Sequence, residues 1–143
     1  MIRPQDSPAA TLSMDAQDLP HIVIRACMTV HATLGTGLTR DAYEECLAVE
    51  LRSLEIPFVR GQPLQFQYRG HPVTAAASLD FVIENTLLLK VLACDAVSDL
   101  DRRNMETWLK LSGLKTGIIV NFQVPVLRKG IHRISLKRRE ENE

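Results

Sequence analysis

The chain has 143 residues, of which 45% are hydrophobic and 24% are charged, a composition typical of one soluble globular domain. Its 17 basic and 17 acidic residues cancel, so the overall charge gives no electrostatic reason to expect nucleic acid or an acidic surface as a partner. The three cysteines show no metal-binding spacing, and no apolar run is long enough to span a bilayer. We therefore predict a cytoplasmic domain with free thiols and no membrane anchor.

Two terminal segments differ from the rest in composition. Residues 1–18 are rich in Pro, Ser, Ala, Asp and Gln and offer little apolar surface for burial, so we expect a flexible arm without a signal peptide. Residues 138–143 form a charged tail. A single domain is predicted between them, over residues 19–137.

Two helices are predicted at the start of this domain. Apolar residues recur at helical spacing over 21–34, and the Gly-Thr-Gly segment at 35–37 ends this first helix. Thr39 is placed to cap a second helix that continues to Leu54. Pro57 stops this second helix.

Strands follow the two helices. Residues 64–75 alternate apolar and polar side chains around an Arg-Gly-His-Pro turn, which predicts a β-hairpin. Residues 78–93 contain two apolar runs on either side of a Glu-Asn-Thr break. This pattern predicts two strands that are joined by a tight turn.

The last third of the chain contains one more helix and two more strands. The helix is predicted over 98–113, with Ser98 or Asp99 as its N-cap. The apolar run 116–122 is typical of a strand that is buried on both faces, and 130–136 alternates like a final strand. This order of elements predicts an α/β fold with a mixed β-sheet flanked by helices.

Lys90 is the one charged side chain in the apolar run 87–93. A lysine is rarely buried unless it is paired. Asp80 lies on the preceding predicted strand, ten positions earlier, so its carboxylate is expected to approach Lys90 across the hairpin. A simple ion pair would account for both residues, and the same arrangement is used in metal-dependent nuclease sites. Because side chains alternate along a strand, Leu88 shares the face of Lys90.

Taken together, these segments resemble the bacterial GxxExxY proteins, a branch of the PD-(D/E)XK nuclease-like superfamily. The resemblance covers about residues 20–136 and runs through the glycine-rich turn, the helix that begins near Tyr43, the hairpin, the strands of Asp80 and Lys90, and the final helix and strands. It implies a restriction-endonuclease-like α/β core. For an active member it also implies cleavage of nucleic acid with Mg²⁺ or Mn²⁺.

The active-site pattern of that family can be compared with this chain position by position. The strand aspartate and the lysine are kept as Asp80 and Lys90, and the motif tyrosine is kept as Tyr43. The motif glutamate, the glutamate two residues before the lysine, and a glutamine in the later helix are replaced. They fall on Arg40, Leu88 and Asn104, respectively.

These replacements work against a metal site. Mg²⁺ prefers oxygen ligands that include carboxylates, and leucine at position 88 supplies none. Arg40 would place a cation near the same pocket, so Asp80 is the one metal ligand that the resemblance still provides. We therefore expect no resident cofactor, with Mg²⁺ or Mn²⁺ bound only if another carboxylate has taken over. The carboxylates near the relevant segments are Glu44, Glu84, Asp95, Asp99 and Asp101.

Ordinary structural roles are open for the other conspicuous residues. Tyr43 is expected to be a core aromatic residue whose hydroxyl is hydrogen-bonded. Trp108 is expected in the core or at an interface. The basic residues Arg128, Lys129 and Arg133 are typical of a solvated surface, and their alternative role is contact with phosphate.

We interpret the chain as a catalytically impaired nuclease-like protein that acts as an interaction, self-assembly or scaffolding module. The strand 116–122 and the helix of Trp108 are expected to offer apolar surface to another copy, so a homo-oligomer or a complex with a protein partner is predicted. Two alternatives stay open. One is a metal-dependent nuclease with a relocated carboxylate, and the other is nucleic-acid binding without cleavage.

Overall fold

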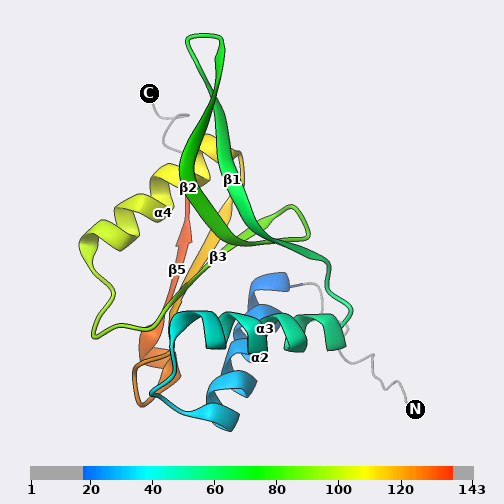
Figure 1. Ribbon diagram of the computed structural model, residues 1–143, viewed down its shortest axis with the longest axis vertical. Helices are drawn as coiled ribbons and strands as arrows, with labels where there is room; N and C mark the ends of the chain where they lie inside the picture. Colours follow the sequence, from blue (N-terminus) through cyan, green and yellow to red (C-terminus); the bar gives the residue numbers. More distant parts are fainter. Residues whose placement is uncertain (1–17, 137–143) are drawn as a thin grey trace.

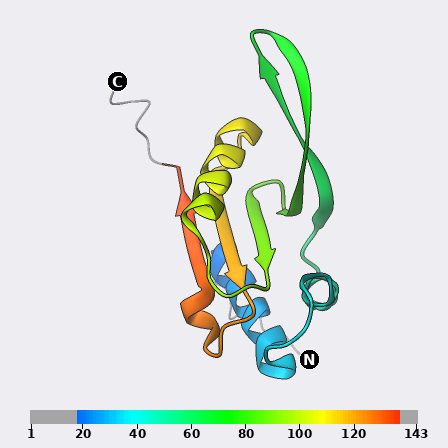
Figure 2. The same cartoon turned by 60° about the vertical axis from the view of Figure 1, so that its left-hand side comes forward.

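The computed structural model describes residues 18–136. Apart from Asp18, the predicted arm 1–18 and the predicted tail 138–143 lie outside these residues. Helices and strands follow one another in the order α2, α3, β1, β2, β3, α4, β4, a short 3-10 helix and β5 (Figures 1 and 2). Within the described range, no helix has the length and apolar character that a bilayer span requires.

The two N-terminal helices form as predicted. Helix α2 covers Leu19–Leu34, and Gly35 ends it with a φ of 72°, a conformation that glycine adopts without steric cost. Helix α3 covers Arg40–Ser53 and has Thr39 at its N-cap. The Gly-Thr-Gly segment therefore separates two helices, and it sets the direction in which α3 leaves the turn.

Three strands follow in two consecutive hairpins. They are β1 (Phe58–Tyr68), β2 (His71–Ile83) and β3 (Leu87–Leu92). The β1–β2 pair begins earlier and is longer than the sequence pattern predicts. Its register opens with Phe58 opposite Ile83 and continues to the tip.

Each hairpin turn holds two consecutive residues at positive φ. These are Arg69 and Gly70, at 51° and 81°, and Glu84 and Asn85, at 52° and 58°. Two central residues with positive φ define the type I′ turn, whose twist matches that of paired strands. The break after Ile83 therefore lets β3 return directly beside β2.

The C-terminal part contains α4 (Asp99–Ser112), β4 (Thr116–Asn121), the 3-10 helix η2 (Leu127–Gly130) and β5 (Ile131–Ser135). Ser98 is the N-cap of α4 and forms a capping box with Asp101. Gly113 ends the helix in the left-handed conformation. The short helix η2 is the one element in the described range that the sequence pattern does not predict.

The strands form one five-stranded sheet in the order β1-β2-β3-β4-β5. The pairing of β3 with β4 is parallel, whereas the other three pairings are antiparallel. Helices α2 and α3 pack against one face of this sheet and α4 packs against the other. The predicted α/β class, with a mixed sheet flanked by helices in a restriction-endonuclease-like arrangement, is confirmed.

Alternate residues of β3 enter two different cores. Leu87, Leu89 and Val91 pack below α2 and α3, whereas Leu88 packs below α4. Leu88 is only 1% exposed, and its cluster includes Met105 from α4. Met105 also fills the space above its neighbour Gly117, where an added Cβ would collide with the methionine sulfur. Position 88 is therefore a packed apolar site.

The strand that was expected to contact another copy is not available. Strand β4 lies between β3 and β5, and Ile118 to Phe122 are fully buried within this protein. The prediction that β4 offers an apolar interface is therefore wrong. Trp108 on α4 is half-buried, and the Lys90 ammonium lies 5.3 Å from the centre of its ring, so a contact through this helix stays a prediction.

The β1–β2 hairpin projects beyond the rest of the sheet, as the green ribbon shows in Figures 1 and 2. Strand β2 pairs with β3 only from Phe81 to Ile83, so the remainder of β2 has β1 as its strand neighbour. The hairpin leaves the helix-covered part of the sheet near Phe81, where the pairing of β2 with β3 ends.

We expect the substitution Leu88→Ala to lower the free energy of unfolding by about 2–5 kcal/mol, because it leaves a cavity in a closed apolar cluster. Urea denaturation of both proteins measures this change. Val59→Ala is the control, since Val59 is 50% exposed and its truncation should change stability by less than about 0.5 kcal/mol. Equal effects of the two substitutions would contradict a core position for Leu88.

Candidate functional site

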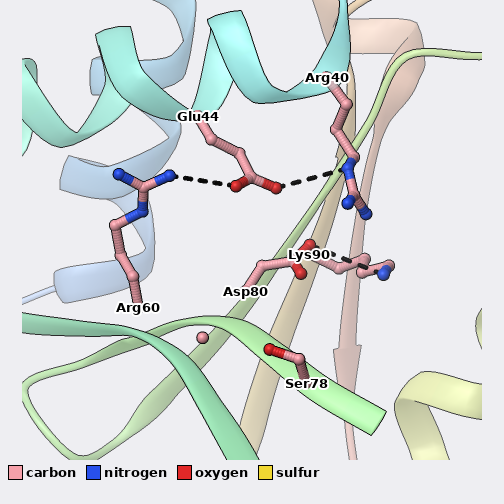
Figure 3. Close-up of a pocket in the computed structure, with 7 residues that line it drawn as sticks. Arg40, Glu44, Arg60, Ser78, Asp80 and Lys90 are labelled. Atoms are coloured by element: carbon pink, nitrogen blue, oxygen red, sulfur yellow. Dashed lines mark hydrogen bonds and ion pairs between the residues drawn. The ribbon is translucent and has the colours of Figure 1, made fainter.

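A polar pocket of about 440 Å³ lies between α3 and the strands β1, β2 and β3 (Figure 3). Ion pairs and hydrogen bonds to two carboxylates, those of Glu44 and Asp80, organise it. The side chains and main chain that line it belong to Arg40, Glu44, Arg60, Gly61, Ser78, Asp80 and Lys90.

Helix α3 supplies the first two side chains, Arg40 and Glu44. Residues four apart on a helix lie on the same face, so both project toward the pocket. The Nε atom of Arg40 lies 3.5 Å from Oε2 of Glu44. Glu44 is 13% exposed, whereas Arg40 is 50% exposed and lies toward the pocket opening.

Arg60 approaches Glu44 from β1, on the opposite side of the carboxylate (Figure 3). Its guanidinium donates hydrogen bonds to Oε1 of Glu44 at 3.2 Å and to Oε2 of Glu45 at 3.0 Å. The guanidinium carbon also lies 5.3 Å from the centre of the Phe81 ring. Burial alone would lower the pKa of Arg60, but the hydrogen bonds and negative charges of Glu45 and Glu44 raise it above its ordinary value.

Glu44 therefore lies between two guanidinium groups. Its Oε1 atom accepts a hydrogen bond from Arg60, whereas its Oε2 atom is buried and accepts none from residues 18–136. The remaining interaction of Oε2 is the charge of Arg40 at 3.5 Å. A buried carboxylate oxygen is costly to desolvate unless cations compensate it, and the two arginines supply that compensation.

Asp80 and Lys90 form the ion pair that the sequence predicts. The Lys90 Nζ atom lies 3.6 Å from Oδ2 of Asp80, and the side chains are 19% and 8% exposed. The same oxygen accepts the hydrogen bond of the Val91 amide at 3.0 Å. Because the β2–β3 register ends at Phe81 and Leu89, the Asp80 carboxylate takes the place of a main-chain acceptor.

Tyr43 is a fully buried core residue, as predicted. Its ring stacks on Phe122, with the centroids 4.5 Å apart and the planes inclined by 6°. Its hydroxyl donates to the Gly35 carbonyl at 2.6 Å and accepts from the Leu38 amide at 3.3 Å. Tyr43 thereby ties the glycine turn to β4, and this contact sets the position of α3 and of its pocket side chains.

The three replaced motif positions lie in different places. Arg40 lines the pocket, whereas Leu88 is in the core below α4 and Asn104 is half-buried on α4 without lining the pocket. Position 88 therefore supplies apolar packing and no oxygen ligand.

Glu44 is the single member of the predicted relocated carboxylates that lines the pocket. Asp101 belongs to the capping box of α4, and Asp99 pairs with Arg102 at 3.2 Å. Glu84 lies in the β2–β3 turn, and Asp95 is exposed beyond β3. These four carboxylates have other places in the structure and do not reach the pocket.

The predicted phosphate-contacting residues also lie away from the pocket. Arg128 and Lys129 are exposed on η2, and Arg133 is on β5, at the opposite edge of the sheet from β1. Arg133 Nη2 lies 3.9 Å from Asp18 Oδ1. The structure does not bring this basic group together with Asp80 and Lys90.

The pocket residues do not fit the Mg²⁺ or Mn²⁺ ion that the resemblance implies. Such an ion requires several oxygen ligands with free lone pairs. The pocket offers two carboxylates, and both face cations of the same chain. Among residues 18–136, no group of three or more His, Cys, Asp or Glu side chains is placed to hold a metal. The donor set is therefore that of an ion-pair network.

Sequence analysis did not identify Arg60, Gly61 or Ser78 as pocket residues. Glu44 was one of five candidate carboxylates, and its spacing of four from Arg40 is a signal that distinguishes it from the others. No comparable local signal marks Arg60. Its place depends on how β1 packs beside α3, which is a long-range contact.

A family model described as the PD-(D/E)XK nuclease superfamily matches residues 17–134. The match spans α2 to β5, so it includes every residue that lines the pocket. No curated protein and no solved structure matches the chain.

A double-mutant cycle tests the ion pair of Asp80 and Lys90. We expect Asp80→Asn and Lys90→Met each to destabilise the protein, and the double variant to recover roughly 1–3 kcal/mol relative to the sum, because one substitution alone leaves a mostly buried charge without its partner. Unfolding in urea provides the free energies of unfolding of the unchanged chain, the two single variants and the double variant.

The exposed pair of Asp99 and Arg102 is the matched control for this cycle. Its side chains are 86% and 39% exposed, so the same substitutions there should couple by less than about 1 kcal/mol. Additive effects of the Asp80 and Lys90 substitutions would show that the two charges do not stabilise each other.

Proposed function

The chain belongs to the PD-(D/E)XK nuclease superfamily, and we propose that it is a catalytically impaired member that acts by binding rather than by cleaving. One observation carries this proposal. Each carboxylate in the pocket is held by cationic side chains of the same chain, Glu44 by Arg40 and Arg60, and Asp80 by Lys90.

The chemistry of metal-dependent cleavage explains why this arrangement opposes it. A metal ion in such a site activates water and neutralises the charge that develops on the phosphate. In this pocket, the ion would have to displace Arg40 and Arg60 from Glu44 and share Asp80 with Lys90. Only then would it have two protein ligands. Leu88 adds no third ligand, because its side chain is buried among apolar residues.

A nuclease with a relocated carboxylate is the second candidate, and Glu44 favours it. The Oε2 atom of Glu44 is buried beside the pocket and accepts no hydrogen bond from residues 18–136. In this alternative, Glu44 and Asp80 would act together after Arg40 has moved away. Arg40 is half-exposed, so its movement is not blocked by packing.

Self-assembly or protein binding is part of our proposal, and the edge of the sheet supports it. Within residues 18–136, β5 pairs with β4 alone. An edge strand presents unpaired main-chain groups on its outer side, and a strand of another chain can add to them. This route replaces the apolar interface that the sequence predicted.

A cytoplasmic location is also proposed, on the basis of the cysteines. Cys27, Cys46 and Cys94 are free thiols, which suits a reducing compartment. Burial raises the pKa of the Cys27 thiol to about 12, although a main-chain hydrogen bond acts in the opposite direction. Cys27 is therefore protonated and unreactive at neutral pH.

We expect the purified chain to show no cleavage of single- or double-stranded DNA or RNA that Mg²⁺ or Mn²⁺ stimulates. Gel assays over a range of metal concentrations measure this. Metal-stimulated cleavage that is lost in both Glu44→Gln and Asp80→Asn would overturn the proposal and support the relocated carboxylate.

The substitution Arg40→Glu should increase the affinity for Mn²⁺, because it removes the cation beside Glu44 and adds a carboxylate on the same helix face. Isothermal titration calorimetry compares it with the unchanged chain. Arg25→Glu, an exposed substitution with the same charge change on α2, is the control. Equal Mn²⁺ affinities for the two variants would contradict the inhibitory role of Arg40.

Self-assembly predicts a stable mass in solution above the 16.0 kDa of one chain. Light scattering coupled to size-exclusion chromatography measures it. Substitution of Arg133 by proline on β5 should lower the mass if the edge strand forms the contact, because the Arg133 amide faces away from β4 and proline cannot donate a main-chain hydrogen bond. A strictly monomeric protein at all concentrations would reject self-assembly.

A further inference from the structure

We propose that the pocket is an anion site that binds a phosphate group without a metal ion. This inference rests on the proposed function, namely binding without cleavage, and adds the chemical class of the ligand. Its basis is that two cationic groups of the pocket, Arg40 and Lys90, keep donors that the pocket carboxylates do not occupy.

Two of the three cations retain free donors. Within residues 18–136, the terminal nitrogens of Arg40 have no acidic partner, because its ion pair with Glu44 uses Nε. The Lys90 ammonium lies 3.6 Å from Asp80, beyond hydrogen-bonding distance, so its donors are not occupied by that carboxylate. Arg60 is different, since Glu44 and Glu45 occupy both of its terminal nitrogens.

The floor of the pocket is small and polar. Ser78 is exposed on β2 with its hydroxyl directed into the space below Asp80 (Figure 3). Gly61 has a φ of 69°, and a Cβ at this position would come within 3.7 Å of the Ser78 hydroxyl oxygen. That distance is an ordinary van der Waals contact, so glycine is favoured at position 61 by its positive φ rather than by lack of space.

Phosphate suits this set of donors. The planar guanidinium of Arg40 presents several N–H groups in a fork that matches the oxygens of a phosphate, and Lys90 adds a compact charge. Both side chains lie at the pocket opening or within reach of it, with exposed fractions of 50% and 19%. A volume of about 440 Å³ is within the range of small-molecule sites.

Arg40 gives this pocket the positive charge that a bound metal ion would supply in an active member of the family. In the family pattern the position holds a carboxylate, which would help to bind a cation that in turn contacts phosphate. The arginine contacts the anion directly, so the metal is not needed for attraction. Asp80 then acts as a positioning residue, because it holds Lys90 at the pocket.

This arrangement predicts opposite effects for two neighbouring substitutions. Arg40→Gln removes a direct phosphate contact and should weaken binding at least about tenfold, the usual loss for one charge-assisted hydrogen bond. Glu44→Gln removes a carboxylate that repels the ligand and competes for Arg40, so binding should be kept or tightened. If Glu44 were instead a metal ligand, Glu44→Gln would abolish metal-dependent binding, because it neutralises that ligand.

Trp108 offers a direct readout. It is the single tryptophan of the chain, and the Lys90 ammonium lies 5.3 Å from the centre of its ring. An anion that draws Lys90 toward the pocket changes the environment of this ring. Its fluorescence should therefore change saturably during a titration.

The experiment titrates the full chain with inorganic phosphate and, separately, with a short oligonucleotide, both in EDTA and at constant ionic strength. We expect a saturable change in Trp108 emission that Arg40→Gln weakens and Arg25→Glu, remote on α2, leaves unchanged. Circular dichroism confirms that each variant is folded. Tighter binding of the oligonucleotide would assign the phosphate to a polynucleotide backbone, and tighter binding of phosphate would assign it to a small molecule.

Three results would overturn the inference. They are the absence of a saturable response to either ligand, a response that sodium chloride reproduces at the same ionic strength, and binding that Glu44→Gln abolishes. These outcomes are distinct from failure of the proposed function. Nuclease activity would reject impaired catalysis without affecting a titration in EDTA, and loss of phosphate binding would leave the absence of cleavage unchanged.

Discussion

The carboxylate of Asp80 connects two strands at the point where their main-chain pairing stops. One oxygen accepts the Val91 amide hydrogen at 3.0 Å and lies 3.6 Å from the Lys90 ammonium. Without it, the amide of a fully buried residue would have no acceptor on that side. β2 can leave β3 here because the side chain replaces the missing strand partner. The pocket occupies the space that this separation opens, and α3 borders it opposite the strands.

The replaced positions oppose metal chemistry in different ways. Arg40 changes the electrostatics of the pocket, since its charge competes for Glu44. Leu88 provides no metal ligand, because its apolar side chain packs below α4. Asp80 and Lys90 keep a structural reason to be present, because their pair and the Val91 hydrogen bond hold the strand ends together. The presence of these two residues therefore has a structural reason that is independent of cleavage.

Local signals were sufficient for most of the fold. The ends of α4 follow from Ser98 and Gly113, and the β2–β3 turn follows from the Glu-Asn-Thr break. The early start of β1 was not predictable, because Phe58 joins the sheet through its pairing with Ile83. For the site, the ten-residue spacing across the predicted hairpin placed Asp80 beside Lys90. Arg60 had no local signal, because its carboxylate partners lie on a helix that is adjacent only in space. The interface predicted for the strand 116–122 was wrong, because β4 is an interior strand of the sheet.

The packing around Leu88 makes positions 40 and 88 differ in how readily they could accept a carboxylate. A carboxylate at position 40 would stand at the rim of the pocket and meet solvent, so a single change there is tolerated by the fold. A carboxylate at position 88 would enter a space that Met105 and its neighbours already fill, with Gly117 leaving room for the methionine alone. A carboxylate at position 88 would therefore require coordinated changes on α4 and β4. A carboxylate at position 40 would change the charge of the pocket without disturbing the packing of the core.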